Sequence, residues 1–247
     1  MKKIAVILSF IFLVSCNGDN VPDCFQNSGD IIEQSFAVED FSAITVFARI
    51  EMIIKEAPEY TVTVQTGEYL MGDIEVVVEN ERLLLRNNNA CNLTRDYGLT
   101  KITVTAPNLT EIRSSTGLPV RSEGVLNYDS LKLVSEDYRE EYHTDGIFEL
   151  EVNASELFFT MNGLSSSFIS GTTTNLDIYY AAGDSRFEGR HLIAENVTIY
   201  HRGTNDITVN PQQSLTANLV STGDVISTNT PPALDVNEQY TGRVIFE

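Results

Sequence analysis

Five residues in two stretches of the chain could together contact a ligand. Tyr179 and Tyr180 precede Tyr200, His201 and Arg202 by about twenty residues. Aromatic rings can stack on a sugar or a peptide, and imidazole and guanidinium groups add polar contacts. A repeating fold also places like residues above one another for packing alone, so a ladder of stacked aromatics is the favoured alternative. The pattern therefore leaves two interpretations, a binding surface for a glycan or protein and a structural ladder.

Acidic residues gather between 136 and 145, where their carboxylate oxygens could bind Ca²⁺. The stretch lacks the oxygen spacing and the turn glycine of an EF-hand, and a solvated acidic loop explains the same charges without metal. No cysteine or histidine spacing fits zinc. We therefore expect neither a metal nor a cofactor. The calcium alternative would use Glu136, Asp137, Glu140, Glu141 and Asp145, together with His143.

The chain carries no catalytic signature. It has no Gly-x-Ser-x-Gly motif, and its imidazole groups are at positions 143, 191 and 201. A polysaccharide-active enzyme on a β-helix would need acidic and basic side chains to converge on one face. We expect a protein that is not an enzyme, and the enzyme alternative would require the convergence of Asp177, Arg186, Glu188, Arg190 and Arg202.

The N-terminus predicts export. Lys2 and Lys3 precede an apolar run, Ile4 to Val14, that is too short to span a bilayer and is typical of a secretory signal. The residues Leu13-Val14-Ser15-Cys16 resemble a bacterial lipobox, although an ordinary signal with an incidental cysteine is the alternative. We predict a lipoprotein signal peptide over 1–15, then a lipidated Cys16 and tether over 16–39. The lipid would hold the protein at the cell envelope, in the outer membrane.

Two cysteines remain after lipidation, and export places them in an oxidising compartment. A single bridge between Cys24 and Cys91 is the simplest outcome, with two unrelated buried thiols as the alternative. Closing a loop of 67 residues (91 minus 24) would stabilise the fold by about 4 kcal/mol in the chain-entropy model.

The composition of the 247 residues excludes general disorder and disfavours one class of partner. Hydrophobic residues make up 42% of the chain and charged residues 21%, which is enough apolar surface to offset chain entropy. The 16 basic residues face 35 acidic ones, for a formal charge of -19. Because such a body repels phosphate backbones, we expect no nucleic-acid partner.

Apolar residues alternate with polar ones from residue 41 onward, as strands require. Ile50, Met52 and Ile54 follow this period of two, and Ile102 and Val104 continue it. Glycine, asparagine and proline separate these segments. We predict antiparallel hairpins over about 40–106.

After Pro107, Gly163, Gly183, Gly203 and Gly223 recur every 20 residues, which is typical of a solenoid. Each glycine follows one strand-like segment and precedes a shorter one, so a coil of two strands with glycine at a corner is expected over about 107–247. A strict 20-residue register would bury Asp177, and we therefore expect a shift of one residue that turns its carboxylate to solvent. Residues 136–143 are expected to form a longer, exposed insertion.

Several short segments match one protein family in their order and spacing. They are Phe41-Ser42-Ala43-Ile44-Thr45-Val46, then Asn89-Ala90-Cys91-Asn92-Leu93-Thr94-Arg95 ahead of Ile102-Thr103-Val104, and the turns Ser115-Thr116-Gly117, Ala182-Gly183-Asp184 and Ser221-Thr222-Gly223-Asp224-Val225. With these segments, residues 40–225 resemble the head GIN domain family, which is described as auto-transporter adhesins. The resemblance implies an all-β domain over 40–247 with a right-handed β-helix-like portion, and a role in adhesion. We expect a lipid-anchored, non-enzymatic binding module, with a purely structural envelope spacer as another alternative.

Overall fold

The computed structural model describes residues 23–89, 91–93, 96 and 98–247. The predicted signal peptide, Cys16 and the first part of the predicted tether lie outside the described residues. Within those ranges the strands form a 17-stranded sheet accompanied by two short 3-10 helices. The predicted all-β fold class is confirmed.

The strands follow the chain from β1 to β17, with one 3-10 helix before β1 and the other before β5. Their bounds are η1 (Asp23–Phe25), β1 (Ile31–Phe36), β2 (Ala43–Phe47), β3 (Glu51–Glu56), β4 (Thr61–Gly67), η2 (Glu68–Asp73), β5 (Ile74–Glu79), β6 (Arg82–Asn87), β7 (Lys101–Ala106), β8 (Glu111–Ser115), β9 (Pro119–Leu126), β10 (Ser130–Ser135), β11 (Ile147–Met161), β12 (Ser166–Tyr180), β13 (Arg186–His201), β14 (Ile207–Leu219), β15 (Val225–Ser227), β16 (Ala233–Glu238) and β17 (Val244–Phe246).

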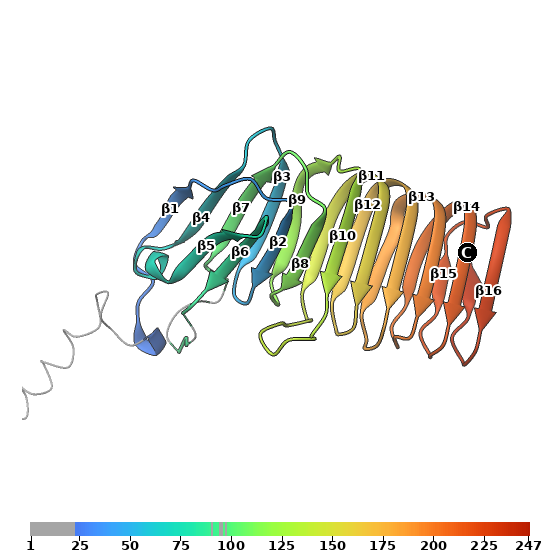
Figure 1. Ribbon diagram of the computed structural model, residues 1–247. Helices are drawn as coiled ribbons and strands as arrows, with labels where there is room; N and C mark the ends of the chain where they lie inside the picture. Colours follow the sequence, from blue (N-terminus) through green and yellow to red (C-terminus); the bar gives the residue numbers. More distant parts are fainter. Residues whose placement is uncertain (1–22, 90, 94–95, 97) are drawn as a thin grey trace, which may run out of the picture.

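The C-terminal half is a stack of coils whose strands run parallel (Figure 1). Leu157 in β11 faces Leu176 in β12, which faces Val197 in β13, which in turn faces Leu215 in β14. The steps between these partners are 19, 21 and 18 residues (157 to 176, 176 to 197, 197 to 215). The coil length therefore varies about the 20-residue interval of the glycines, and successive coils stack in parallel as that interval predicts.

Alternate side chains of these strands point into the coil and form a continuous core. Leu157, Leu176, Val197 and Leu215 are at most 1% exposed. Burying an aliphatic side chain of this kind contributes about 1.5–3 kcal/mol. Each coil covers the apolar side chains of its neighbour, so a single coil could not bury its own apolar face.

Asp177 lies on the outer side of β12, as predicted. Leu176 and Ile178 are buried on either side of it, and Asp177 itself is half-buried. β11 and β12 pair without a register shift. The register between β12 and β13 shifts between Phe168 and Ser170, so the irregularity lies one coil later than expected. Partial burial, with a smaller contribution from the charge of Glu156, raises the pKa of the Asp177 carboxyl.

The repeated glycines stack corner on corner. The amide of Asp184 donates to the carbonyl of Gly163 at 2.7 Å, and that of Gly223 donates to Gly203 at 3.2 Å. Of the four repeated glycines, Gly183 has a positive φ (86°). Gly163 is needed for another reason, since a Cβ there would lie 1.9 Å from Oγ1 of Thr144. Close stacking therefore requires small residues at these corners, and among the four glycines the left-handed backbone conformation occurs at Gly183.

The N-terminal part differs from the predicted antiparallel hairpins. β2 pairs in parallel with β6 on one side and β8 on the other, and β3 pairs likewise with β7 and β9. Among the described residues, β5 and β6 are consecutive strands that pair antiparallel, while β4 pairs antiparallel with β1 and β7. The parallel stack therefore begins at β2, well before Pro107, because alternating apolar residues suit a strand of either direction.

One long connection interrupts the regular corners. Residues 136–146 join β10 to β11 as an irregular loop, whereas residues 162–165 suffice between β11 and β12. The predicted insertion is confirmed, and its side chains lie against the outer face of β2, β6 and β8, where they complete a pocket.

Candidate functional site

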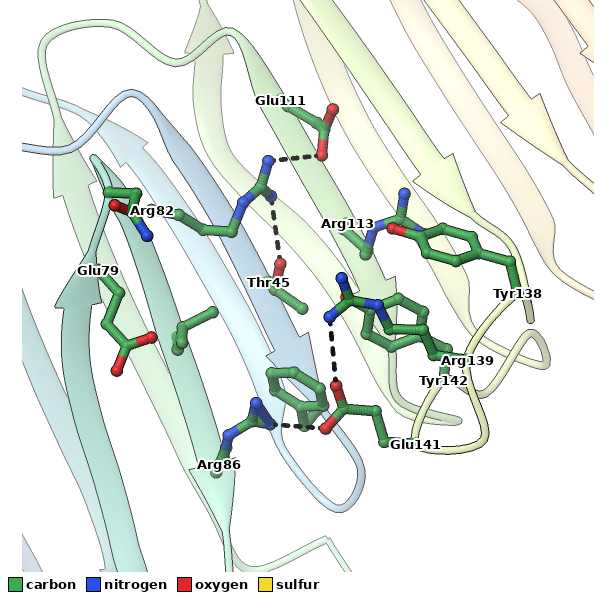
Figure 2. A pocket seen from close by; sticks show the side chains of 13 residues that line it. Thr45, Glu79, Arg82, Arg86, Glu111, Arg113, Tyr138, Arg139, Glu141 and Tyr142 are labelled. Atoms are coloured by element: carbon green, nitrogen blue, oxygen red, sulfur yellow. Dashed lines mark hydrogen bonds and ion pairs between the residues drawn. The ribbon is translucent and has the colours of Figure 1, made fainter.

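A pocket of about 310 Å³ opens on the outer face of β6, β2 and β8 (Figure 2). We call it the arginine–tyrosine pocket. Its volume is at the lower end of the range for small-molecule sites. The residues that line it are Thr45, Phe47, Glu79, Asn80, Arg82, Leu84, Arg86, Glu111, Arg113, Tyr138, Arg139, Glu141 and Tyr142.

Strand alternation positions the floor of this pocket. Side chains two residues apart point to the same face, so Arg82 and Arg86 project from β6 on the side opposite to the buried Leu83 and Leu85. Thr45 lies directly between Leu84 and Arg113 in register. Neighbouring strands are about 4.8 Å apart, which brings the guanidinium groups of β6 and β8 to the same small area.

Arg82 and Arg86 are fixed by neighbouring carboxylates. Nη2 of Arg82 lies 2.9 Å from Oε1 of Glu111, and its Nη1 donates to Oγ1 of Thr45 at 3.2 Å. Nη1 of Arg86 donates to Oε2 of Glu141 at 3.4 Å, and the guanidinium lies 3.5 Å from the centroid of the Phe47 ring. Each arginine is thus held by a charged contact and a second neighbour.

Arg113 is the buried member of the group. Its side chain is 9% exposed, and its guanidinium carbon lies 4.9 Å from the ring centroids of both Tyr138 and Tyr142. Nη2 is 3.7 Å from a carboxylate oxygen of Glu136, which is an ion pair but too long for a hydrogen bond. Nη1 is buried and has no hydrogen-bond acceptor among the described residues. A buried donor without an acceptor is unusual, since most are satisfied.

Two tyrosines of the insertion form the wall over Arg113. Tyr138 and Tyr142 meet edge to face with centroids 5.2 Å apart, and Tyr138 is 60% exposed. Burial and the proximity of Tyr138 raise the pKa of the Tyr142 hydroxyl, which favours its neutral form. The wall is therefore aromatic, and it faces a floor of charged side chains.

The pocket is far less acidic than the chain as a whole. Four arginines and three glutamates line it, and Glu136 pairs with Arg113, so these charges balance in a protein whose formal charge is -19. A balanced cleft of this kind can admit a small anion, while the surrounding charge repels large polyanions.

The five predicted binding residues divide between the outer surface of the coils and their buried core. Tyr179 faces Tyr200 in register, and their rings are stacked with centroids 4.9 Å apart on the outer surface. Tyr180 and His201 are fully buried, and burial lowers the pKa of the His201 imidazole. Arg202 is exposed at the following corner. Tyr179 and Tyr200 each cover one face of the other, which is the geometry of the structural ladder.

The calcium candidates contact basic or amide groups. Glu136 pairs with Arg113, and Glu141 lies near Arg86 and Arg139. Oδ1 of Asp137 accepts a hydrogen bond from Asn162 at 2.7 Å. In the part of the chain that the structure describes, no three His, Cys, Asp or Glu side chains are arranged to hold a metal ion, Glu140 and Asp145 included.

The residues named for an enzyme fall in separate places. Arg186, Glu188 and Arg190 lie close together at the start of β13, with Arg186 Nη2 at 3.2 Å and Arg190 Nε at 4.0 Å from Glu188. Asp177 is in the second half of β12, which pairs with the second half of β13 instead. Arg202 follows β13. The five side chains therefore do not form one cluster.

Sequence analysis missed the arginines of the pocket. Tyr138, Arg139, Glu141 and Tyr142 belong to the insertion that was predicted to be exposed, but their partners come from β2, β6 and β8. The available signal was that six of the eleven arginines fall within residues 82–139, and only the parallel pairing of β6, β2 and β8 brings those of the pocket together.

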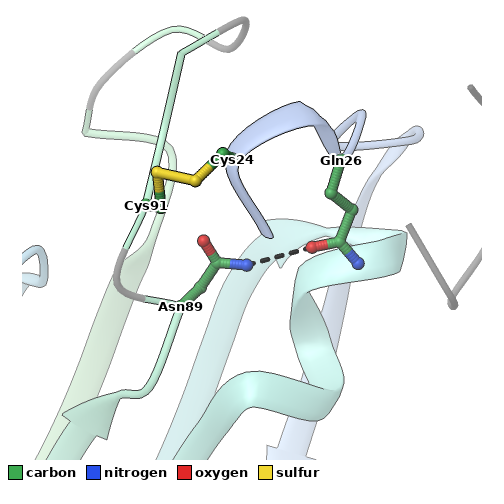
Figure 3. Close-up of a disulfide and its surroundings, with 4 residues drawn as sticks. All are labelled: Cys24, Gln26, Asn89 and Cys91. Carbon is green, nitrogen blue, oxygen red and sulfur yellow. Dashed lines mark hydrogen bonds between the residues drawn. A yellow bond between two sulfur atoms is a disulfide. The ribbon is translucent and has the colours of Figure 1, made fainter. Parts of the chain in front are cut away.

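The predicted disulfide between Cys24 and Cys91 is present, with an S–S distance of 2.03 Å (Figure 3). It attaches η1 to the segment after β6. Beside it, the amide of Asn89 donates to Oε1 of Gln26 at 3.0 Å, which links the same two segments by a buried hydrogen bond.

A family model described as "Putative auto-transporter adhesin, head GIN domain" matches residues 40–231. The chain belongs to this family. The structure is similar to that of a protein described as a "putative adhesin" from Bacteroides fragilis, with 19% identity, a TM-score of 0.78, and coverage of 88% of this chain and 97% of that one. A similar fold occurs in a "putative adhesin" from Parabacteroides merdae, with 14% identity, a TM-score of 0.63, and coverage of 88% of this chain and 97% of that one. A "putative lipid binding protein" from Parabacteroides distasonis is similar as well, with 15% identity, a TM-score of 0.58, and coverage of 88% of this chain and 97% of that one.

No curated protein matches the sequence. Among the described residues, none of the helices has the length and apolar character needed to cross a membrane. At these identities the structural neighbours establish the fold of this head GIN domain protein and leave its ligand to be inferred from the site itself.

Proposed function

We propose that this head GIN domain protein is a non-enzymatic binding module of the cell envelope, anchored through lipid on Cys16, and that the arginine–tyrosine pocket is its ligand site. The coils form a right-handed β-helix-like solenoid that holds the pocket rigidly. The observation that carries the proposal is Arg113, a buried cation with a free donor in a pocket walled by aromatic rings. The family description as an adhesin supports a binding role.

The side chains of the pocket favour binding over catalysis. The pocket holds no serine, cysteine or histidine that could act as a nucleophile or an imidazole base. Two of its carboxylates, those of Glu111 and Glu141, are already engaged in ion pairs with arginines. Arginine and tyrosine are enriched among the residues that contribute most to protein binding sites.

The binding proposal is tested by screening the full chain, purified in detergent, against immobilised glycans, matrix proteins and envelope extracts. Arg139→Gln removes an exposed charge of the pocket, and Arg186→Gln removes an exposed charge elsewhere as its matched control. A bound component that is retained by Arg186→Gln and lost by Arg139→Gln supports the pocket. Binding that both variants retain places the site elsewhere, and no binding at all favours a structural spacer.

Lipid anchoring is tested separately. Metabolic labelling with a radioactive or clickable fatty acid is expected to mark the wild-type chain and to fail in Cys16→Ser, because the lipid is attached through that thiol. The variant is also expected to leave the membrane fraction, since several acyl chains give nearly irreversible attachment. Label that persists in Cys16→Ser would contradict the anchor.

A further inference from the structure

We infer that the ligand of the arginine–tyrosine pocket is a carboxylated sugar, such as a uronic or sialic acid residue of a glycan, and that Arg113 receives its carboxylate. The inference rests on the proposed function and names the class of ligand for the same site. It is argued from the hydrogen-bonding state of the arginines, the charges around them and the aromatic wall.

The first step is the difference among the arginines. Arg82 has acceptors in Glu111 and Thr45, and Arg86 has one in Glu141. Arg113 has no hydrogen bond of normal length to Glu136, and its Nη1 has no acceptor among the described residues. Arg139 lies 3.9 Å from Glu141, and its side chain is exposed to solvent. Arg113 is therefore the buried guanidinium with donors left for a ligand, and a carboxylate can accept from two of them at once.

The second step concerns the charge that the ligand brings. Glu79, Glu111 and Glu141 line the pocket with the four arginines, and Glu136 pairs with Arg113, so these charges balance. A phosphate dianion or an acidic peptide would add two or more negative charges to this balanced set. A single carboxylate adds the least negative charge that still gives Arg113 a charged acceptor.

The third step concerns the remaining lining groups. Ionised glutamates only accept hydrogen bonds, so a ligand that approaches them must carry donors. The hydroxyl groups of a sugar supply such donors, and the apolar face of a pyranose ring can stack on a tyrosine. A neutral sugar would satisfy the glutamates and the rings but would offer Arg113 only an uncharged hydroxyl oxygen, which is a weaker acceptor than a carboxylate. A sugar that bears a carboxylate satisfies all three kinds of group.

Access to Arg113 depends on Tyr138. The guanidinium lies beneath the Tyr138 and Tyr142 rings, and Nη1 is buried in the unliganded protein. Tyr138 is the more exposed ring, in the irregular insertion (Figure 2). It turns aside as the carboxylate enters and then stacks on the sugar. Because the chain has no Trp, tyrosine fluorescence can follow this change directly.

The experiment compares acid and ester forms of the same glycans on the full wild-type chain in detergent. The probes each carry one carboxylate: galacturonate, a disaccharide with one glucuronate residue, and sialyllactose, each beside its methyl ester. We expect at least one acid to bind, with its ester about tenfold weaker or more, since a charge-assisted hydrogen bond is lost. Equal affinity for acid and ester would overturn the inference, as would binding of none of the acids.

Substitutions in the pocket test which residues are responsible for the preference for the acid over its ester. Arg113→Met and Arg139→Gln are expected to weaken binding of the acid by about tenfold or more, while Arg186→Gln leaves it unchanged. Circular dichroism establishes that each variant is folded, and Arg139→Gln, with its exposed side chain, serves if Arg113→Met does not fold. An acid preference that survives both pocket variants would also overturn the assignment.

The outcomes separate this inference from the proposed function. If all the acids fail but another ligand from the screen binds wild type and not Arg139→Gln, the pocket is a binding site and only the ligand class is wrong. If no ligand distinguishes Arg139→Gln from Arg186→Gln, the pocket proposal fails as well.

Discussion

The outer face of the coil stack has two regions with opposite character. In the regular coils, β11 to β14, one ladder of polar side chains is satisfied from strand to strand: Glu156 accepts from Asn175 at 2.6 Å, Asn175 from Asn196 at 3.1 Å, and Asn196 from Ser214 at 2.8 Å. Among the described residues of these coils, the buried atoms without a hydrogen-bond partner are the hydroxyls of Ser167 and Ser185 and Oε1 of Glu188, and none of them belongs to a cation. Around the arginine–tyrosine pocket, the outer face of β2, β6 and β8 holds arginines, aromatic rings and the buried Nη1 of Arg113, which has no acceptor among the described residues. Both regions have the same strand geometry, so the difference lies in the side chains.

This contrast indicates where stability and recognition are located. A satisfied ladder leaves little for a ligand to gain, because each hydrogen bond to it would replace one already made. An unsatisfied buried donor costs stability, on the order of 1–3 kcal/mol, until a ligand completes it. We therefore expect substitutions in the regular coils to change unfolding free energy, and substitutions in the pocket to change binding.

The largest expected effect is in the core of the regular coils. Phe187 is fully buried and meets Phe159 edge to face at 4.8 Å. Phe187→Ala should lower the unfolding free energy by about 3–5 kcal/mol, because it removes apolar contacts and leaves a cavity. Urea unfolding followed by circular dichroism measures this change. A loss below 1 kcal/mol would contradict the idea that stability resides in these coils.

The next largest loss of stability is expected at the stacked corner that contains Gly183. Gly183 has a φ of 86°, and an added Cβ would lie 2.3 Å from the carbonyl oxygen of Gly163. Gly183→Ala should cost more than about 1–3 kcal/mol, the usual cost of a strained backbone, because steric overlap adds to that strain. Gly124 is the matched control, since its φ is 83° but no atom lies within 4 Å of an added Cβ. Equal losses in the two variants would show that close stacking has no part.

The fold could be predicted largely from periodicity, and the pocket could not. Glycines every 20 residues predict stacked corners, and Leu176 and Ile178 on either side of Asp177 fix which side of the strand is buried. Alternation does not reveal strand direction, which explains why β2 and β3 were expected in antiparallel hairpins. Their parallel partners β6 to β9 are distant in sequence.

The arginine–tyrosine pocket depends on those distant pairings. Arg86 and Arg113 are separated by 27 residues (113 minus 86) and meet because β6 and β8 both pair with β2. Tyr138 and Tyr142 then reach them from a loop whose path has no sequence period. The aromatic residues that did follow the period, Tyr179 and Tyr200, form a ladder on the regular coils.

A buried histidine in the regular coils predicts a dependence of stability on pH. Burial lowers the pKa of His201 below its unfolded value of about 6.5, so the unfolded chain binds the proton more readily. Its contribution is therefore fully present above pH 6.5 and is lost as pH falls toward the folded pKa, at a slope of up to about 1.4 kcal/mol per pH unit. Urea unfolding at pH 7.5 and 5.5 should show a larger decrease in wild type than in His201→Asn. The same decrease in both proteins would assign the effect to other groups.

The smallest expected change in stability is at the pocket itself. Arg113→Met replaces a buried guanidinium by an apolar chain of similar length, which removes the unsatisfied Nη1 but leaves Glu136 without its partner. Because Glu136 is partly exposed, water can solvate its carboxylate once Arg113 is gone, so the two effects should offset to within about 1 kcal/mol. Thermal unfolding of Arg113→Met beside Phe187→Ala measures the contrast directly. A loss of several kcal/mol in Arg113→Met would mean that the arginine supports the fold, and that the two regions of the outer face share one role instead of dividing stability from recognition.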